Sequence, residues 1–389
     1  MTAALALAIL ALVIWIYLVA LHGGFWLGRE NDWGDVALGR APWPHIAAVI
    51  PARNEADMIP QSLPTLLAQD YPGTFSIVLV DDQSEDGTGP IAQKLAAYAA
   101  RSVTVLSGAV RPAGWTGKVW AQHQGIAHAS TLEPKPDYLL LTDADIGYAP
   151  DAVTRLVTRA RAGNFVLTSL MANLKCDSPA ERALIPAFIF FFQMLYPFRW
   201  VNRPSFSTAG AAGGCMLAER AALERAGGVA AIRGALIDDC SLAKVMKQQG
   251  PIWLGLTERV QSLRPYPRVE DIRQMVARSA YAQLRYSPIL LAGTVAGMGV
   301  TYLAAPVIAA IGTYPANIIA LLAYGLMALS FQPTLKFYGR SPLWGLALPL
   351  IALTYLAFTL DSAYQQYQGR GGMWKGRTQA GARSKPESE

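Results

Sequence analysis

Short apolar runs alternate with helix-like stretches through the middle of the chain. The runs with the pattern of buried strands are Ile46–Ile50, Phe75–Val80, Val103–Leu106, Tyr138–Leu141 and Phe165–Leu167. The stretches with a helical pattern between them are Glu55–Gln69, Thr88–Ala100, Lys118–Ala129 and Asp151–Arg161. Short buried strands that alternate with helices indicate βα units. We therefore expect an α/β fold with a mixed, mainly parallel sheet.

Both ends of the chain are apolar enough to enter a membrane. Ala3–Leu21 carries no charge and is long enough to span a bilayer. It lacks the basic start and the cleavage site of a signal peptide, so we expect an uncleaved anchor. Further spans are expected at 288–311, 317–332 and 342–361. The predicted organisation is an anchor (1–22), a linker (23–43), the α/β domain (44–265), an amphipathic interfacial segment (266–287), a membrane region of about three helices (288–362) and a basic disordered tail (363–389).

Charge around the apolar segments predicts the orientation. Arg29, Arg40 and Arg53 follow the first segment and no basic residue precedes it. The positive-inside rule then places the α/β domain in the cytoplasm, on a multi-pass inner-membrane protein. Arg370 and the rest of the basic tail would lie outside if all three later segments span. Either one of these segments is re-entrant or the rule fails here.

The overall composition supports a membrane protein. Charged residues make up only 15% of the chain and the mean hydropathy is +0.25, whereas a soluble protein has about 25% charged residues. The net charge of +6 suits an anionic lipid or an anionic substrate. No basic stripe with interleaved aromatic residues is present, so we expect no nucleic-acid partner. Three scattered cysteines give no zinc or disulfide pattern.

Pairs of acidic residues follow several of the apolar runs. They are Asp81-Asp82, Asp143 with Asp145, and Asp238-Asp239, the last after a short predicted strand at 235–237. Ligands of such sheets bind beyond the carboxyl ends of the strands. Two carboxylates one residue apart can hold a hard divalent cation, Mg²⁺ or Mn²⁺, which binds substrate phosphates. Taken singly, the Asp81-Asp82 segment is equally compatible with a turn and a helix cap, and the other two pairs are more typical of a loop cap or a helix N-terminus.

Three further segments offer polar or small residues at the same edge. Pro51-Ala-Arg53-Asn-Glu55 places a cation and an acid after the first run. Lys118, just before a predicted helix, could neutralise a phosphate, although a solvated loop lysine is the common alternative. Gly213-Gly214 would let the backbone approach a sugar closely, or would serve tight packing.

The acidic pair Asp238-Asp239 opens a probable helix. A carboxylate at that position can accept a proton from an attacking hydroxyl. Acidic residues also favour a helix N-terminus through its dipole, so the pair alone does not establish a base.

In this order, the motifs resemble those of family 2 glycosyltransferases. The segments are PARNE at 51–55, VDDQSEDGT at 80–88, TDADI at 142–146, GGCM at 213–216 and DDCSL at 238–242. The resemblance covers roughly residues 44–290 and implies a GT-A fold. The membrane layout is similar to the ceramide-glucosyltransferase-like branch. The W-x-G-K segment at 115–118 and the long C-terminal membrane portion resemble bacterial hopanoid-biosynthesis-associated glycosyltransferases.

The resemblance also implies residue roles. The nucleoside would contact Pro51, Arg53, Glu55, Asp81 and Asp82. Asp143 and Asp145 would be the D-x-D pair, with Asp145 the principal metal ligand. Asp239 would be the base, and Asp238 stands where the family usually has Glu.

At the membrane, the family's (Gln/Arg)-x-x-Arg-Trp motif has its nearest counterpart in Gln283-Leu-Arg285-Tyr286. It is one residue short and ends in Tyr. This departure puts the family's role for Arg285 in doubt and argues against a processive polysaccharide synthase. Arg285 and Tyr286 are expected on the acceptor side.

The predicted activity is inverting transfer of a sugar from a nucleotide-sugar, a UDP-sugar by family habit, to a lipid acceptor. A hopanoid or a polyprenyl phosphate would fit, and Lys118 with the metal would neutralise the leaving diphosphate. A nucleotidyl- or phosphoryl-transfer enzyme and a non-catalytic nucleotide-sugar-binding membrane protein are the alternatives. A transporter is disfavoured because spans 288–311, 317–332 and 342–360 hold no ionisable residue.

Overall fold

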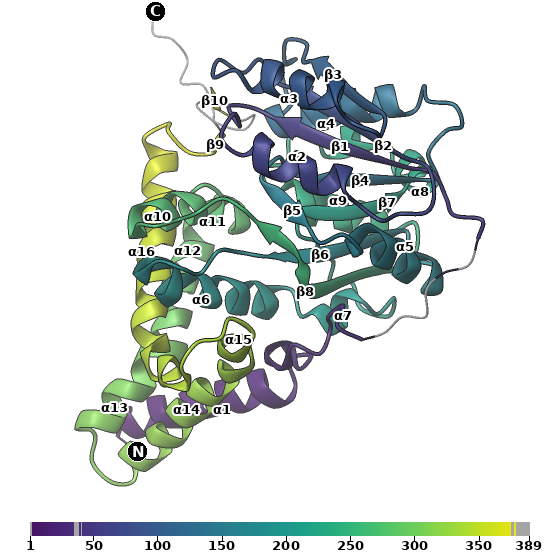
Figure 1. Cartoon of the computed structure of the whole chain (residues 1–389). Helices are drawn as coiled ribbons and strands as arrows, with labels where there is room; N and C mark the ends of the chain where they lie inside the picture. Colours follow the sequence, from purple (N-terminus) through teal and green to yellow (C-terminus); the bar gives the residue numbers. More distant parts are fainter. Residues whose placement is uncertain (1, 35–38, 40, 375–376, 379–389) are drawn as a thin grey trace, which may run out of the picture.

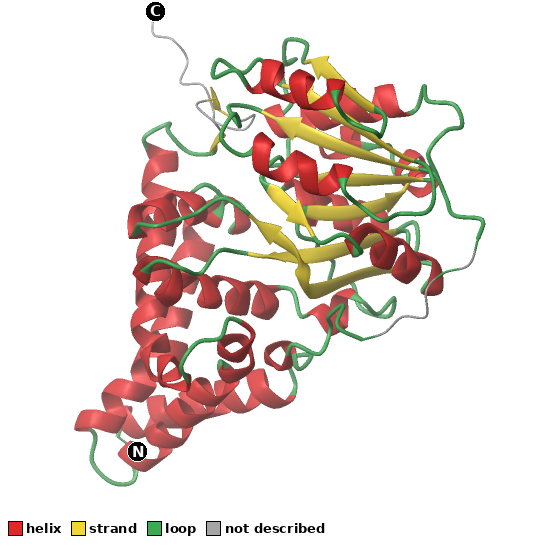
Figure 2. Cartoon of the chain, in the orientation of Figure 1, coloured by secondary structure: helices red, strands yellow, loops and turns green. Residues whose placement is uncertain are grey.

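The computed structural model describes residues 2–34, 39, 41–374 and 377–378. An α/β domain built on one large sheet stands beside a bundle of apolar helices (Figures 1 and 2). The two parts are joined along the chain at α1, at α6 and at the segment after β8.

The sheet has eight strands in the order β3-β2-β1-β4-β7-β6-β8-β5. They are β1 (Ile46–Ala52), β2 (Phe75–Asp81), β3 (Val103–Ser107), β4 (Tyr138–Thr142), β5 (Ile146–Tyr148), β6 (Leu167–Asn173), β7 (Cys215–Glu219) and β8 (Ile252–Ser262). Strand β1 runs parallel to β2 and β4, β2 to β3, and β6 to β8. Strand β7 is antiparallel to both of its neighbours, and β5 is antiparallel to β8. The predicted mixed, mainly parallel sheet is confirmed.

Helices cover both faces of the sheet. They are α2 (Ile59–Leu67), α3 (Thr88–Ala97), α4 (Gly117–Ala129), α5 (Ala152–Ala162), α8 (Arg220–Arg225) and α9 (Asp238–Lys247). Successive strand residues point to opposite faces. Leu139 and Leu141 of β4 therefore join one apolar cluster with α4 and α9, while Leu140 joins the other with α2 and α5. Burial on both faces explains the continuous apolar runs of the sequence.

Apolar helices form the second part of the molecule. They are α1 (Ala3–Ala20), α6 (Pro179–Leu195), α7 (Phe198–Val201), α12 (Pro288–Met298), a π-helical turn (Gly299–Ala304), α13 (Ala305–Ile311), α14 (Ala316–Ser330), α15 (Gln332–Phe337) and α16 (Leu348–Tyr367). Within the described residues, five helical stretches are long and apolar enough to cross a membrane. Four of them coincide with the apolar stretches predicted from the sequence to within a few residues at each end, except that the last continues to Tyr367. The fifth, Pro179–Val201, was not predicted as a span, and 56% of its most apolar 18-residue window is buried inside the protein.

Several sequence predictions about local structure are wrong. Residues 235–237 form a loop before α9 rather than a strand. The amphipathic periodicity of residues 269–286 predicts one helix, but the segment contains two, α10 (Val269–Ala277) and α11 (Ala280–Gln283), because the chain turns at Arg278 and Ser279. Strands β5, β7 and β8 were not predicted. In the tail, α16 continues to Tyr367 and is followed by a two-stranded hairpin, β9 (Met373–Trp374) with β10 (Arg377–Thr378). Residues 379–389 lie outside the described part.

All strand ends that matter for ligand binding lie at one edge of the sheet. Strands β1, β2, β4, β6 and β8 end there, and the antiparallel β5 and β7 begin there. In Figure 1 this edge faces the side of the molecule where α10, α11 and α16 lie. The topology thus turns the polar loops of the domain toward the apolar helices.

Glu181 anchors the segment that follows β8 to the start of α6. Its carboxylate accepts hydrogen bonds from the backbone N–H groups of Asp177 (3.0 Å), Ser178 (2.8 Å) and Tyr266 (2.6 Å). The Ser178 side chain in turn accepts from the Glu181 N–H, which completes a capping box. Glu181 is 2% exposed, so these N–H groups have little access to water.

We expect Glu181→Ala to lower the free energy of unfolding by about 2 kcal/mol or more, because a helix cap and buried N–H partners are lost together. Thermal or chemical denaturation of the protein in detergent measures the change. Glu224→Ala is the matched control, since this exposed carboxylate pairs only with Arg220 in the described structure, and a change within about 0.5 kcal/mol is expected. Equal effects of the two substitutions would contradict the anchoring role.

Candidate active site

Two loops at the site edge are bonded to each other and form one wall. The Arg53 guanidinium donates to the backbone oxygens of Asp82 (2.5 Å) and Gln83 (2.8 Å). The Glu55 N–H donates to the Thr88 hydroxyl at 2.8 Å. Arg53 is nearly buried and Asp82 is fully buried. These two predicted nucleoside contacts therefore contribute to the architecture of the wall.

Pro51, Glu55 and Asp81 lie on the same wall. Pro51 is paired in register with Val80 at the end of β1, and Asp81 ends β2 with one oxygen accepting the Ser84 N–H at 3.0 Å. The structure thus brings the five residues predicted for nucleoside contact together.

Lys118 joins two of the predicted acidic pairs. It lies in the first turn of α4, and its Nζ is 2.8 Å from Asp143 Oδ1 and 3.1 Å from Asp238 Oδ2. Burial alone would lower the pKa of Lys118, but the two carboxylates hold this pKa well above its usual range. Burial raises the pKa of Asp143, with Lys118 opposing that rise. Lys118 is therefore a charged, paired residue of the site and not a solvated loop lysine.

Asp239 is oriented by backbone donors at the start of α9. Its Oδ2 accepts the Gly213 N–H at 3.0 Å, and its Oδ1 accepts the Cys240 N–H at 2.7 Å. A Cβ on Gly213 would lie 3.1 Å from the Lys118 nitrogen, so this position has little room for a side chain. Burial, together with the negative charge of Asp238, raises the pKa of Asp239 to about 6. A carboxylate with such a pKa suits a general base near neutral pH.

Gly213 and Gly214 precede β7, whose first residues Cys215 and Met216 are strand and not turn. A Cβ on Gly214 would approach the Ile146 side chain to 2.9 Å. Both glycines thus permit close packing between the start of β7, the D-x-D segment and the predicted base.

Arg264 is a site residue that the sequence did not reveal. Its Nε is 2.9 Å from Asp145 Oδ2, and its Nη2 pairs with Glu55. It follows β8, and recognition of β8 as a strand ending at this edge would have predicted its position.

Without a bound nucleotide, side-chain cations already engage both carboxylates of the predicted divalent-metal site. Each D-x-D carboxylate already contacts a side-chain cation, Asp143 with Lys118 and Asp145 with Arg264. Within the part of the chain that is described, no group of three His, Cys, Asp or Glu residues is placed to hold a metal ion. A metal would have to share these carboxylates with the two cations.

A pocket of about 440 Å³ opens beside the acidic pair of α9. Its lining includes Tyr196, Ile237, Cys240, Ser241, Lys244, Gln283, Arg285 and Tyr286. The Gln283 amide donates to the Tyr196 hydroxyl at 2.8 Å, which connects the end of α6 to α11. Among the described residues, neither Lys244 nor Arg285 has a hydrogen-bond or ion-pair partner for its side chain. The pocket therefore offers two cations to an incoming anion.

Arg285 and Tyr286 have an unusual backbone. Both are in the left-handed region, with φ of 53° and 55°, in the turn between α11 and α12. This conformation costs non-glycine residues about 1–2 kcal/mol each. The turn places Arg285 and Tyr286, predicted on the acceptor side, in the pocket wall.

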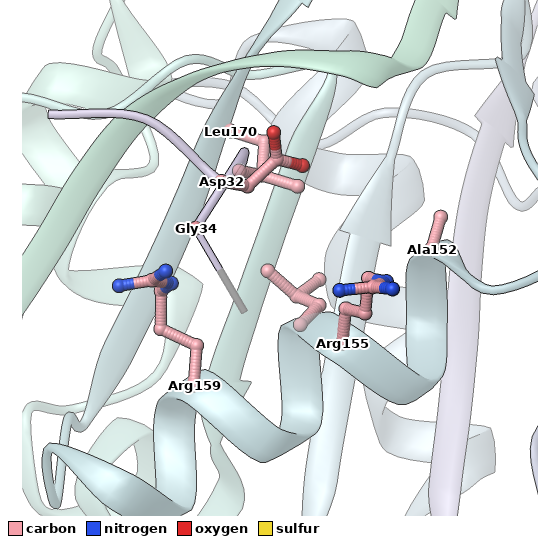
Figure 3. A pocket seen from close by; sticks show the side chains of 7 residues that line it. Asp32, Gly34, Ala152, Arg155, Arg159 and Leu170 are labelled. Atoms are coloured by element: carbon pink, nitrogen blue, oxygen red, sulfur yellow. The ribbon is translucent and has the colours of Figure 1, made fainter. Parts of the chain in front are cut away.

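A second cavity lies away from this edge, between the N-terminal segment and α5. Figure 3 shows Asp32 across the cavity from α5, from which Arg155 and Arg159 extend. Its volume is about 10 Å³, which accommodates at most a single water molecule. This cavity is too small for a nucleotide-sugar or a lipid headgroup.

Comparison with known proteins agrees with the geometry. Residues 47–227 match the family model described as glycosyl transferase family 2. Over 140 residues the chain is 31% identical to an undecaprenyl-phosphate 4-deoxy-4-formamido-L-arabinose transferase of Pseudomonas savastanoi pv. phaseolicola, covering 34% of this chain and 38% of the relative. The corresponding protein of Pseudomonas aeruginosa is 29% identical over 177 residues, 44% and 45% of the two chains. The chain thus spans less than half the length of these curated relatives.

Among solved structures, the fold is similar to a mannosyltransferase from Pyrobaculum calidifontis determined in complex with GDP-Man and Mn²⁺. The TM-score is 0.53 and the identity 21%, over 90% of this chain and 99% of the other. This similarity extends through the apolar helices as well as the sheet. Residues 47–227 are therefore similar to a family 2 glycosyltransferase domain, and the chain has a GT-A-like fold.

Proposed function

We propose that the protein is a membrane-bound inverting glycosyltransferase that transfers a sugar from a nucleotide-diphosphate sugar to a lipid phosphate. The observation that carries the proposal is the pocket beside Asp239, which presents Lys244 and Arg285 and opens next to apolar helices. The family 2 domain and the relatives that act on undecaprenyl phosphate support the same reaction class.

The donor binds along the wall formed by residues 51–55 and 81–88. Glu55 and Asp81 face the edge where ribose and base hydroxyl or amide groups can be recognised. Lys118 and Arg264 supply positive charge for the diphosphate. UDP is the nucleotide that the sequence resemblance implied, whereas the solved neighbour holds GDP-Man, so both UDP-sugars and GDP-sugars are candidate donors.

The acceptor pocket favours a phosphate over a neutral alcohol. Lys244 and Arg285 offer charge-assisted hydrogen bonds, which contribute about 1.5–3 kcal/mol each when made to an anion. A hopanoid hydroxyl would leave both cations without a counter-charge. The lipid chain would extend among the apolar helices, and the basic residues after α1 predict that the domain faces the cytoplasm.

Transfer is a single displacement. An acceptor oxygen attacks the anomeric carbon, the bond from that carbon to the diphosphate oxygen breaks, and its electron pair leaves with the nucleoside diphosphate. Attack opposite the leaving group inverts the anomeric centre. Lys118, held between Asp143 and Asp238, remains charged and stabilises the departing diphosphate.

The part played by Asp239 depends on the acceptor. A phosphate monoester has a second pKa of about 6, so near neutrality it often arrives without its last proton. Asp239 then only accepts the proton of the singly protonated fraction. A lipid alcohol would need the base in every turnover. The two acceptor classes are therefore distinguishable by how strongly the rate depends on Asp239.

The proposal is tested by transfer of label from UDP- and GDP-sugars to defined lipids by the full chain in lipid vesicles. We expect label on polyprenyl phosphate and release of a nucleoside diphosphate, with none on a hopanoid alcohol. Label on the alcohol alone would overturn the acceptor assignment. Release of a nucleoside monophosphate or of free diphosphate would indicate a nucleotidyl- or phosphoryl-transfer enzyme. Nucleotide binding without turnover of either acceptor would indicate a binding protein.

Replacing the two pocket cations should weaken acceptor binding selectively. For Lys244→Ala and Arg285→Ala we expect the KM for polyprenyl phosphate to rise roughly tenfold each, with the KM for the nucleotide-sugar unchanged. Steady-state kinetics with each substrate varied separately measures this. Lys94→Ala, which removes an exposed lysine on α3, is the control and should leave both constants unchanged. An unaltered acceptor KM in both pocket variants would refute the phosphate pocket.

Transfer should also depend on the ionisation of Asp239. Its pKa is raised to about 6, so below this pH the carboxyl is protonated and cannot accept a proton, and kcat/KM should fall as pH decreases. Because the acceptor phosphate titrates in the same range, the profile is repeated with a difluoromethylphosphonate analogue of lower pKa. If the apparent pKa of the acidic limb stays near 6 with the analogue, the limb reports the ionisation of Asp239. If that pKa shifts with the analogue, the limb reports the ionisation of the acceptor instead.

A further inference from the structure

The Asp145 carboxylate is already paired with a side-chain cation, the guanidinium of Arg264. Arg264 places Nε 2.9 Å from Asp145 Oδ2 and pairs through Nη2 with Glu55. All three side chains are mostly buried, with exposed fractions between 10% and 23%. An arginine cannot lose its proton in a protein, so no change of pH in the working range frees Asp145.

The backbone around Arg264 is fixed on both sides. The Leu263 N–H donates to the Asp145 carbonyl at 2.8 Å, and the Tyr266 N–H donates to Glu181 at 2.6 Å. Arg264 therefore remains beside Asp145 unless its side chain alone rotates. The ion pair belongs to the built site and is not a chance contact of a surface arginine.

We propose that Arg264 competes with divalent cations for Asp145, so that the site excludes a free ion and admits one only with a nucleotide diphosphate. A guanidinium against the carboxylate repels an approaching divalent cation and occupies one of its few oxygen ligands. A diphosphate removes both obstacles. Its oxygens serve as ligands for a cation, and they offer the guanidinium a new anionic partner with matching geometry.

Glu55 makes this exchange feasible. When Arg264 releases Asp145, its second contact, to Glu55 on the nucleotide-binding wall, can persist. The guanidinium then turns toward the donor without becoming an isolated buried charge, which would be strongly destabilising. Arg264 is thus a positioning residue that links occupancy of the nucleotide wall to the ligand set of Asp145. Only the diphosphate step rests on the proposed function.

The test is Mn²⁺ binding to the full chain in detergent, measured by electron paramagnetic resonance without nucleotide. We expect weak binding by the wild type and roughly tenfold or more tighter binding by Arg264→Gln, because a unit positive charge beside the ion is removed. Arg264→Lys keeps the charge and should stay close to the wild type. The double variant that combines Arg264→Gln with Asp145→Asn should lose the tighter Mn²⁺ binding, because the carboxylate ligand is removed.

Arg259→Gln is the matched control. Arg259 lies in β8 with the same exposed fraction as Arg264, 23%, but pairs with Asp32 and Asp151 away from the site. Its replacement should leave Mn²⁺ affinity unchanged. Thermal unfolding confirms that each variant is folded. If folded Arg264→Gln binds Mn²⁺ no more tightly than the wild type, or if Arg259→Gln shows the same gain, the proposal is wrong.

A second measurement concerns nucleotide. Coupling between two ligands is reciprocal, so Mn²⁺ should raise the affinity for UDP or GDP more in the wild type than in Arg264→Gln. Equal coupling in the two proteins would overturn the diphosphate step. Neither measurement requires sugar transfer. The binding results would therefore still hold if the proposed acceptor proved wrong. Likewise, a failure of the binding test would leave the proposed acceptor untouched.

Discussion

The ammonium of Lys118 is the constraint around which the site is arranged. It is shared by Asp143, which follows β4, and Asp238, which opens α9. Loss of one partner from a buried ion group leaves an uncompensated charge and is strongly destabilising. The start of α4, the end of β4 and the start of α9 must therefore keep their relative positions. Asp239 is then directed to the Gly213 N–H, and Gly213 has little room for a side chain.

Helix α9 extends this constraint to the acceptor side. The acidic pair lies at its first turn, Lys244 reaches the pocket from its middle, and Lys247 lies at its last residue. The Lys247 ammonium donates to the backbone oxygens of Trp200, Val201 and Thr208, at 2.6–3.1 Å. The loop after α7 is thereby attached to the helix that carries the predicted base. A displacement of α9 would move the base, a pocket cation and part of the pocket wall together.

The strands and site residues that could be predicted from the sequence are those marked by local periodicity. Those that were missed depend on tertiary pairing between distant segments. Strands β1, β2 and β4 are buried on both faces, so they appear as unbroken apolar runs. Strand β8 is buried only in its first half, and Glu258 and Arg259 interrupt its apolar pattern. Arg264, whose position depends on β8, was missed with it. The apolar residues 235–237 suggested a strand, but they line a pocket instead. Lys118 contacts two acidic pairs that are distant from it in the sequence, and the spacing of residues along the chain does not predict such a contact.

The position of the pocket argues for a lipid rather than a soluble phosphate. Its wall includes the turn at Arg285 and Tyr286, immediately before the long apolar helix that begins at Pro288. The strained backbone of that turn persists only because the flanking helices α11 and α12 determine it. A phosphate at Arg285 would therefore lie where the polar site meets the apolar helices. An alkyl chain attached to that phosphate could remain among those helices while its head group reached Asp239. The transfer free energy of about 0.8 kcal/mol per CH₂ group that keeps such a chain out of water would hold the phosphate at the membrane beside the pocket. A soluble phosphate would gain only the polar contacts, so the same two cations would favour the lipid.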